Sequence, residues 1–268
     1  MKDITRKMPA FEPGSVWLVG AGPGDAGLLT LYAYEALHQA DVLVYDALVG
    51  KDILALTGPD TILEYAGKRG GKPSPKQTDI TERLIALAKE GKKVLRLKGG
   101  DPYIFGRGGE EALTLAAHGV PFRVIPGISS GVGGLAFAGI PLTHRETNSA
   151  VTFLTGHDAT GEVPNMNWEH LAKGSPVIVL YMAVKHLATI TRHLIGFGRA
   201  KDEPVAVVFK ATTEEQKVLV SDLEHIAEKT EQSGLKPPAL VVIGEVVQYQ
   251  ETLDWYGRFL AGQQAAED

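Results

Sequence analysis

Two glycine-rich loops constrain the fold of this chain, because each connects an apolar segment of strand length to a helical pattern. The first loop reads GAGPGDAG over residues 20–27 and follows the apolar residues 16–19. The second reads RLKGGDPYIFGRGGE over residues 96–110 and begins inside the strand-like segment 94–97. Glycine lets backbone N–H groups come close to a ligand. The loops therefore predict a ligand site on an α/β fold, with a tight structural turn as the alternative for the second loop taken alone.

Read literally, the first loop contains a dinucleotide-binding pattern. Gly22, Gly24 and Gly27 spell G-x-G-x-x-G, and Asp46 ends the next apolar segment, residues 42–45. Dinucleotide folds place an acidic residue at about this point to bind the ribose. The pattern therefore keeps open a nicotinamide-dependent or flavin-dependent oxidoreductase.

Two residues of the same loop oppose a diphosphate ligand. Pro23 lacks the N–H donor that a pyrophosphate needs, and Asp25 adds negative charge at the helix N-terminus. A cationic or zwitterionic ligand suits this loop better, with its adenosine held elsewhere. In the second loop, the carboxylate of Asp101 can accept two hydroxyl hydrogen bonds, which a ribose would offer.

Composition predicts a cytoplasmic enzyme that folds without covalent cross-links. The chain has 268 residues, 44% of them hydrophobic, which is enough for a large core. It contains no cysteine, so disulfides, thiolate catalysis and sulfur-based metal sites are excluded. No apolar segment is long enough to span a membrane and no secretory leader is recognisable. A net charge of −5 argues against general nucleic-acid binding.

Strand-like and helical segments alternate between two expected tails, 1–13 and 251–268, which favours parallel sheet with covering helices. We expect an N-terminal α/β domain over residues 14–143 and a C-terminal α/β domain over residues 144–250, with the site in the cleft between them. The expected strands are 16–19, 42–45, 94–97, 122–125, 151–155, 177–181, 205–209, 217–220 and 239–243. The expected helices are 28–39, 79–90, 129–138, 184–195 and 221–233.

A series of motifs, taken in order, resembles the uroporphyrinogen-III C-methyltransferases of the tetrapyrrole methylase family. The similarity extends over nearly all of residues 14–247. The motifs are VGAGPGD (19–25), ADVLVYD (40–46), GKR (67–69), LKGGDPYIFGRGGEE (97–111), VIPGISS (124–130), AGIPLTHR (138–145), LYMA (180–183) and PPAL (237–240). Several of them are too long for chance agreement.

The resemblance implies a two-lobed fold that binds S-adenosylmethionine between its lobes and needs no metal. Members of this family methylate two β-carbons of uroporphyrinogen III in succession, through precorrin-1 to precorrin-2, which leads to siroheme and cobalamin. The pyrrole is the nucleophile, so the enzyme has to align the partners and exclude water. Deprotonation of the macrocycle then needs a base close by.

The family pattern also implies roles for single residues. It makes Asp46 the proton acceptor and Lys68 the proton donor, although Asp46 could instead cap a turn and Lys68 could be a solvated surface charge. Polar, small or backbone-contacting residues are implied for the cofactor, together with Met182, whose alternative is an ordinary core position. This cofactor set is Pro23, Gly99, Gly100, Asp101, Ile104, Ser129, Ser130, Met182, Ala211 and Ala239.

The implied substrate carries eight carboxylates, so an acidic protein has to present positive charge locally. Arginine is favoured because its planar fork binds a carboxylate through two hydrogen bonds. Arg107 is the first choice, since it lies inside the second glycine loop; Arg96, Arg69 and Arg145 follow, with Lys98 and His144 as further candidates. Ala47 stands where the family often has an arginine, which leaves one substrate carboxylate without an assigned partner.

Other activities remain open at this point. A later precorrin methyltransferase or a diphthine synthase would share the first glycine loop, and a porphyrin carrier would bind tetrapyrrole without consuming the methyl donor. The 13 residues before Gly14 are too few for the additional activities of fused siroheme synthases, so we expect methylation alone. Family members are typically homodimers, and we expect the same here.

Overall fold

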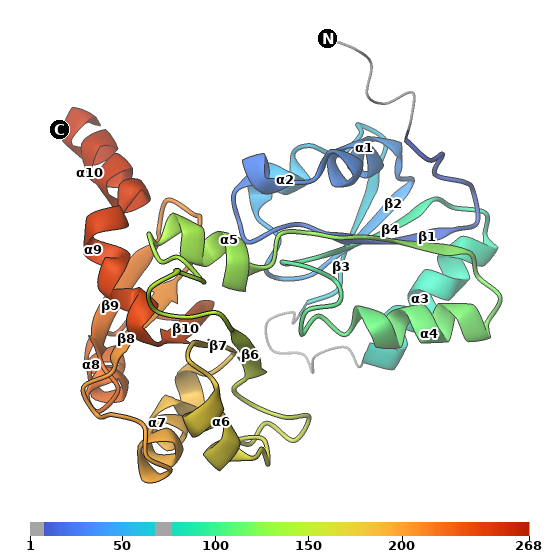
Figure 1. Cartoon of the computed structure of the whole chain (residues 1–268). Coiled ribbons are helices and arrows are strands. Elements are labelled where there is room, and N and C mark those ends of the chain that lie inside the picture. Colours follow the sequence, from blue (N-terminus) through green and yellow to red (C-terminus); the bar gives the residue numbers. More distant parts are fainter. Residues whose placement is uncertain (1–7, 68–76, 268) are drawn as a thin grey trace. The chain divides into compact units, whose positions relative to one another are not determined.

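The computed structural model describes residues 8–67 and 77–267, which form two compact units (Figure 1). The units are Met1–Ser129 and Ser130–Asp268. The sequence placed the division later, at 143/144. The helix that starts at Ser130 accounts for the difference, because its Leu135 and the following Ala138 are fully buried in the core of the second unit.

The first unit is built around a five-stranded sheet in the order β3-β2-β4-β1-β5, and every neighbouring pair is parallel. Four of the strands were predicted, whereas β3 was missed because its Ile62 and Leu63 are exposed. The elements of this unit are β1 (Val16–Gly20), the 3₁₀ turn η2 (Ala26–Leu28), α1 (Leu31–Gln39), β2 (Val42–Tyr45), α2 (Lys51–Leu54), β3 (Ile62–Tyr65), α3 (Gln77–Lys89), β4 (Val94–Lys98), α4 (Gly108–Ala117) and β5 (Phe122–Ile125).

Helices cover both faces of this sheet, as α/β architecture requires. Helices α1 and α2 lie on one face and pack on Val19, Leu95 and Leu97 (Figure 1). Helices α3 and α4 lie on the other face and pack on the alternate residues, including Val94. Because successive residues of a strand point to opposite faces, β4, the central strand, is buried on both sides.

The first helix begins later than the sequence predicted. A single helix was expected over 28–39, but α1 starts at Leu31 after the separate turn η2. Thr30 explains this start, because its hydroxyl accepts a hydrogen bond from the Ala33 N–H at 3.1 Å and so caps the helix.

The second unit also has a five-stranded sheet, in the order β6-β7-β10-β8-β9. The expectation of a parallel sheet is wrong here: only β6 and β7 are parallel, and the other pairs are antiparallel. Residues 210–216 between β8 and β9 are too few for a crossover helix, so these strands form a hairpin. The strands are β6 (Thr152–Thr155), β7 (Ile178–Tyr181), β8 (Pro204–Phe209), β9 (Lys217–Asp222) and β10 (Ala239–Ile243).

Helices again lie on both faces of the second sheet. One face carries α6 (Trp168–Gly174), α7 (Leu187–Gly196) and α8 (Ile226–Gln232). The other carries α5 (Ser130–Phe137) and the turn η4 (Glu245–Tyr249). The predicted helix 184–195 is the turn η3 (Val184–His186) followed by α7, and the predicted 221–233 is shortened to α8.

Both expected tails contain ordered structure that the sequence did not predict. Phe11 is buried and stacks on Trp17 with ring centroids 4.4 Å apart. At the other end, α9 (Gln250–Leu253) and α10 (Trp255–Glu267) are helical, and Trp255 and Tyr256 each contact Phe137 edge-on. Aromatic contacts distant in sequence hold these segments, which is why local periodicity missed them. No helix within residues 8–67 and 77–267 is long and apolar enough to cross a membrane.

Candidate functional site

The two glycine loops of the first unit are joined to each other by their backbones. Gly22 and Gly100 form an isolated antiparallel bridge, with N–O distances of 2.7 Å and 3.1 Å. Both residues have positive φ angles, 75° and 67°, which glycine adopts without steric cost. The loops after β1 and β4 therefore form one continuous structure at the carboxyl edge of the sheet.

Three glycines allow this close approach. A Cβ atom on Gly20 would lie 2.5 Å from the carbonyl oxygen of Gly100, and one on Gly127 would lie 2.2 Å from the same oxygen. Real side chains do not tolerate such distances. The ends of β1, β4 and β5 can converge only because Gly20 and Gly127 carry no side chain and Gly100 adopts a positive φ.

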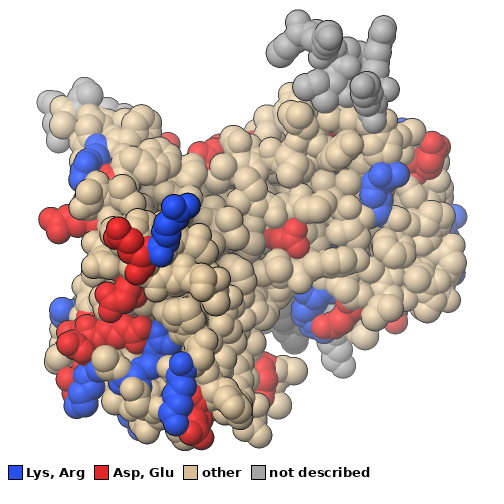
Figure 2. Space-filling view, viewed as in Figure 1, with Lys and Arg blue, Asp and Glu red and all other residues tan. Residues whose placement is uncertain are grey.

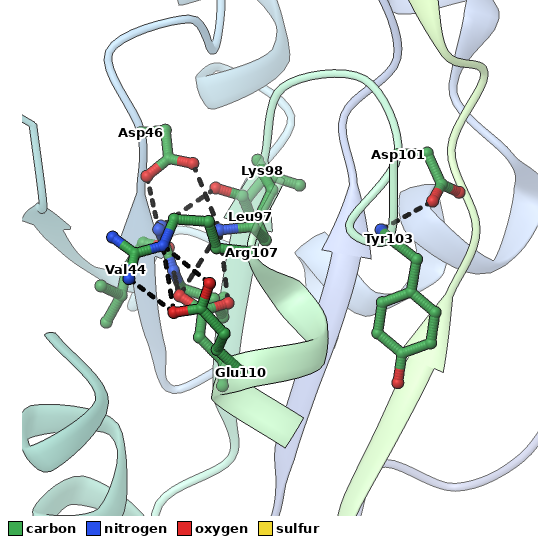
Figure 3. Close-up of polar contacts among 10 residues, drawn as sticks. Val44, Asp46, Leu97, Lys98, Asp101, Tyr103, Arg107 and Glu110 are labelled. Atoms are coloured by element: carbon green, nitrogen blue, oxygen red, sulfur yellow. Dashed lines mark hydrogen bonds and ion pairs between the residues drawn. The ribbon is translucent and has the colours of Figure 1, made fainter. Parts of the chain in front are cut away.

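Asp101 holds the second loop in place. Its Oδ1 accepts a hydrogen bond from the Tyr103 N–H at 2.8 Å (Figure 3). Its Oδ2 accepts one from the Gly127 N–H at 3.0 Å. Each carboxylate oxygen has two lone pairs, so a ribose could still bond to Asp101. The residue thus has a structural task that the sequence did not predict, and its contact to a ribose stays a prediction.

The first loop differs locally from a dinucleotide site. The carboxylate of Asp25 accepts the Gly27 N–H at 2.7 Å and caps η2, rather than leaving that N–H for a phosphate. The helix α1 starts only at Leu31 and is capped by Thr30. A phosphate at this loop would therefore lack the helix N-terminus that dinucleotide folds supply.

A group of four charged side chains lies beside the loops. Arg96 and Lys98 project from β4, Glu111 from α4, and Asp46 follows β2 (Figure 3). Arg96 joins both carboxylates, with Nη2 2.5 Å from Asp46 Oδ1 and Nε 3.0 Å from Glu111 Oε1. The side chain of Asp46 is 31% exposed, whereas that of Glu111 is fully buried.

Lys98 lies between the same two carboxylates. Its Nζ is 3.3 Å from Glu111 Oε2, 3.4 Å from Glu111 Oε1 and 3.7 Å from Asp46 Oδ2. Arg96 and Lys98, both candidates for binding substrate carboxylates, are buried. A substrate could reach Arg96 only by displacing one of its present partners.

Sequence reasoning did not single out Glu111, but the sequence contains a signal for it. The buried residues of α4 are Gly108, Glu111, Ala112 and Leu115, which recur at the spacing of one helix face. A carboxylate on such a face needs a buried cation. Arg96 and Lys98, two cations at alternate positions of the central strand, are those partners.

Burial and mutual charge perturb these groups. Burial opposes the charged form of Arg96, but Asp46 and Glu111 overcome it and raise the pKa of Arg96 above its ordinary value. Burial and the neighbouring Arg96 lower the pKa of Lys98, and the two carboxylates oppose this only in part. Buried charged groups with perturbed pKa values occur often at functional sites.

Arg107, the last residue before α4, and Glu110, in the first turn of α4, form an exposed pair. Nη2 of Arg107 is 2.5 Å from Glu110 Oε2, and Arg107 adopts a left-handed φ of 58° (Figure 3). The Arg107 hydrogen bond lowers the pKa of Glu110. Ile104 is also exposed and precedes Phe105, which has a positive φ of 50°. Strained, exposed residues are typical of ligand-binding loops.

In the second unit, three of the predicted cofactor residues lie at one edge of the sheet. Met182 follows β7, Ala239 begins β10 and Ala211 follows β8, and the pairing of these three strands makes their ends neighbours. Met182 is exposed and has a φ of 55°. Lys210 and Thr212 flank Ala211 and also have positive φ values.

Ser130 begins α5 beside this edge. The next residue, Gly131, donates its N–H to Tyr181 Oη at 2.9 Å. A Cβ on Gly134 would lie 2.8 Å from that of Ala211, so α5 packs closely on the same strand ends. Of the cofactor candidates, Ser129 is the last residue of the first unit, and Pro23 and Gly99 lie in its glycine loops.

The remaining basic candidates lie elsewhere. Arg145 is exposed on a turn in which the Asn148 side chain accepts the His144 N–H at 3.0 Å. His144 contacts the Tyr249 hydroxyl at 3.0 Å. Lys68 and Arg69 lie outside the described residues. Figure 2 shows Lys and Arg interspersed with Asp and Glu over the second unit, and pairs such as Lys173–Glu169 at 2.6 Å neutralise part of its positive charge.

A shallow apolar groove of about 660 Å³ lies in the second unit. It is lined by α5, the segment after it, and the α9–α10 region, including Val132, Leu253 and Trp255. Within the described part of the chain, no group of three or more histidine or acidic side chains could hold a metal ion.

Comparisons with known proteins agree with this arrangement. Residues 15–227 match the model of the tetrapyrrole (corrin/porphyrin) methylases. A Sinorhizobium uroporphyrinogen-III C-methyltransferase is 61% identical over 267 residues, covering 99% of this chain and 95% of that protein. A siroheme synthase of Nitrosospira multiformis is 48% identical; 91% of this chain matches it but spans only 51% of its length.

A solved structure is also similar. The uroporphyrin-III C-methyltransferase of Thermus thermophilus, complexed with S-adenosylhomocysteine, has a TM-score of 0.76 and 40% identity, covering 87% of this chain and 99% of that one. The two-sheet α/β fold, the glycine loops and the family match lead to the same conclusion: the chain belongs to the tetrapyrrole methylases.

Proposed function

We propose that this protein is an S-adenosylmethionine-dependent methyltransferase that methylates uroporphyrinogen III twice, through precorrin-1 to precorrin-2. The observation that carries the proposal is the 61% identity to a uroporphyrinogen-III C-methyltransferase over nearly the whole of both chains. The glycine loops and the neighbouring carboxylate of Asp46 supply groups that this chemistry requires.

S-adenosylmethionine supplies an electrophilic methyl group bound to a sulfonium sulfur. When the methyl group bonds to a pyrrole carbon, its bond to sulfur breaks and the sulfur becomes the neutral thioether of S-adenosylhomocysteine. The residues fit such a ligand. Gly99 and Gly100 expose backbone, Asp101 offers carboxylate lone pairs, and the exposed Met182 offers a polarisable side chain. Pro23, Ile104, Ser129, Ser130, Ala211 and Ala239 complete the proposed set.

The chain's own part in the chemistry is the movement of a proton. Each methyl transfer leaves a positive charge on the macrocycle, and loss of one proton neutralises it. We assign the acceptor role to Asp46, because its carboxylate is partly exposed and is held by Arg96 in one orientation. Lys68 is the proposed proton donor, and Arg107 is the first of the proposed substrate-binding residues, followed by Arg145, Arg69 and Arg96.

The proposal extends to the assembly and its setting. We propose a homodimer in the cytoplasm that serves siroheme or cobalamin synthesis, as the family resemblance implies. The apolar groove with exposed Leu253 and Trp255 supports association, because large exposed apolar residues favour protein–protein contact. Size-exclusion chromatography with light scattering would test the dimer, and a monomer at micromolar concentration would contradict it.

The enzyme assay is an anaerobic incubation of the purified protein with uroporphyrinogen III and methyl-labelled S-adenosylmethionine, followed by mass spectrometry of the tetrapyrrole. We expect two added methyl groups, and none without the methyl donor. S-adenosylhomocysteine binding without transfer would keep the fold and redirect the search to later precorrin substrates. Stabilisation by NAD, together with no response to S-adenosylhomocysteine, would instead indicate an oxidoreductase.

A further inference from the structure

The two carboxylate oxygens of Asp46 have different surroundings. Oδ1 is 2.5 Å from Arg96 Nη2 and accepts its hydrogen bond. Oδ2 faces the Lys98 ammonium at 3.7 Å, which is too long for a hydrogen bond but short enough for strong electrostatic attraction. One oxygen is therefore fixed by a bond, while the other has a cation beside it.

Glu111 accounts for the longer distance to Lys98. Both of its oxygens lie within 3.4 Å of Lys98 Nζ, so the ammonium is drawn toward α4 and away from Asp46. Glu111 is fully buried and cannot exchange Lys98 for water. The ammonium is thus anchored at one carboxylate and acts on the other through space.

We propose that Lys98 is a positioning residue for the proton transfer at Asp46: its ammonium, anchored at Glu111, places a positive charge beside Oδ2 and leaves the lone pairs of that oxygen open to the proton. A nearby cation favours the ionised form of a carboxylate. A direct hydrogen bond from Lys98 would occupy Oδ2, whereas at 3.7 Å the charge acts on that oxygen without blocking it. Because this role rests on the proposed function, its test separates the two.

Other charged groups around this pair are accounted for. Arg96 lies on the same strand as Lys98 and binds both carboxylates. Glu110 and Arg107, at the start of α4 and just before it, pair with each other at the surface. Of these groups, only Lys98 has a charge close to Oδ2 without a hydrogen bond to Asp46 in the described structure.

The first experiment compares the pH dependence of methyl transfer in wild type, Lys98→Met and Lys98→Arg. In Lys98→Met we expect the acid limb of the kcat profile to move upward by about one pH unit, because the charge beside the carboxylate is lost. KM for the tetrapyrrole should stay within about twofold. Lys98→Arg keeps the charge, so its acid limb should stay at the wild-type position.

Binding of S-adenosylhomocysteine serves as the check that each variant is folded. If Lys98→Met does not bind S-adenosylhomocysteine, Lys98→Gln is used in its place. Arg199→Met is the matched control, because it removes a buried cation from the second unit. It should lower stability and leave the profile in place. An unmoved acid limb in the neutral Lys98 variant, or a rise in KM with kcat unchanged, would overturn the proposal in favour of a structural or substrate-binding role.

A double-mutant cycle with Asp46→Asn tests whether Lys98 acts through Asp46. If it does, the loss of kcat caused by Lys98→Met should shrink to less than about twofold in the Asp46→Asn background. The same fold-loss in both backgrounds would overturn the inference while leaving the enzyme assignment intact. A wild-type protein that transfers no methyl group would overturn the proposed function itself, and the role of Lys98 with it.

Discussion

Each unit of the molecule buries an arginine against carboxylate, but the two arrangements differ in what remains accessible. In the first unit, Arg96 joins the buried Glu111 to the partly exposed Asp46. In the second, Arg199 pairs with Glu203, which is only 13% exposed, and donates to the Ser175 carbonyl at 2.6 Å. The first arrangement leaves the carboxylate of Asp46 partly exposed to solvent, whereas the second stabilises the connection that contains Arg199 and Glu203.

Their positions explain the difference. Arg96 lies in the middle of the central strand, and its side chain reaches Asp46 just past the carboxyl end of β2, at the edge of the sheet where α/β folds bind ligands. Arg199 lies in the connection between α7 and β8 and is bonded to backbone groups just before β7. A buried arginine can therefore either orient a functional carboxylate or stabilise a loop. The exposure of the carboxylate distinguishes these two roles.

The largest expected effect is on turnover. Asp46→Asn should lower kcat by about 100- to 10,000-fold, the usual contribution of a general base, while S-adenosylhomocysteine affinity stays unchanged. Glu203→Gln, the matched change in the second unit, should leave kcat within about twofold at a temperature where both variants are folded. Wild-type turnover in Asp46→Asn would contradict the difference between the two units, since the carboxylates of Asp46 and Glu203 would then both be structural.

The next effect is on stability. Glu111→Gln should lower the free energy of unfolding by about 3–5 kcal/mol, because Arg96 and Lys98 both lose a buried partner. Glu203→Gln should lower it by less, since Arg199 keeps its bond to the Ser175 carbonyl. Urea unfolding would measure both. A smaller loss for Glu111→Gln than for Glu203→Gln would show that the network in the first unit is not the tighter one.

A smaller change is expected in ligand binding. Asp101→Ala should weaken S-adenosylhomocysteine binding by about tenfold, because a contact to ribose and the bonds that shape the loop are both lost. Calorimetry would measure the dissociation constant, with Asp222→Ala in the second unit as the control. An unchanged dissociation constant would contradict the proposed contact between Asp101 and the ribose.

The smallest effect concerns pH and follows from the lowered pKa of Lys98. Between that lowered value and the ordinary 10.5, the unfolded chain binds more protons than the folded one, so this residue's contribution to stability rises with pH. Below the lowered value, its full burial penalty is present. Unfolding followed from neutral to alkaline pH should show this rise in wild type and Arg199→Met, and its loss in Lys98→Met. Superimposable slopes would contradict it.

Much of the fold could be predicted from local pattern. The apolar segments gave β1, β2, β4 and β5 correctly, and Ala239–Ile243 is the predicted β10. What failed depended on long-range contact. The pairing of β8 with β9 and β10 in antiparallel order, and the aromatic packing of Trp255 on Phe137, are not encoded in any single segment.

The candidate site divides in the same way. Asp46 and Asp101 follow recognisable strands, so their positions could be inferred from the sequence. Arg96 and Lys98 were expected to meet substrate carboxylates, with an ordinary surface charge as the alternative, because lysine and arginine usually lie at the surface. Their burial requires Glu111, which lies on a helix 13 residues beyond Lys98 and meets it only in the folded unit. Chain order alone does not indicate that meeting.

The meeting of Gly20, Gly100 and Gly127 has a consequence for how the chain tolerates variation. Because their backbones touch, a methyl group at Gly20 or Gly127 would separate strand ends that also carry both loops. Saturation mutagenesis should therefore find these positions intolerant even of alanine, beside the permissive exposed Gly109, where a Cβ meets nothing within 4 Å. The two loops therefore constrain each other's sequence: a single substitution at these glycines can damage both loops.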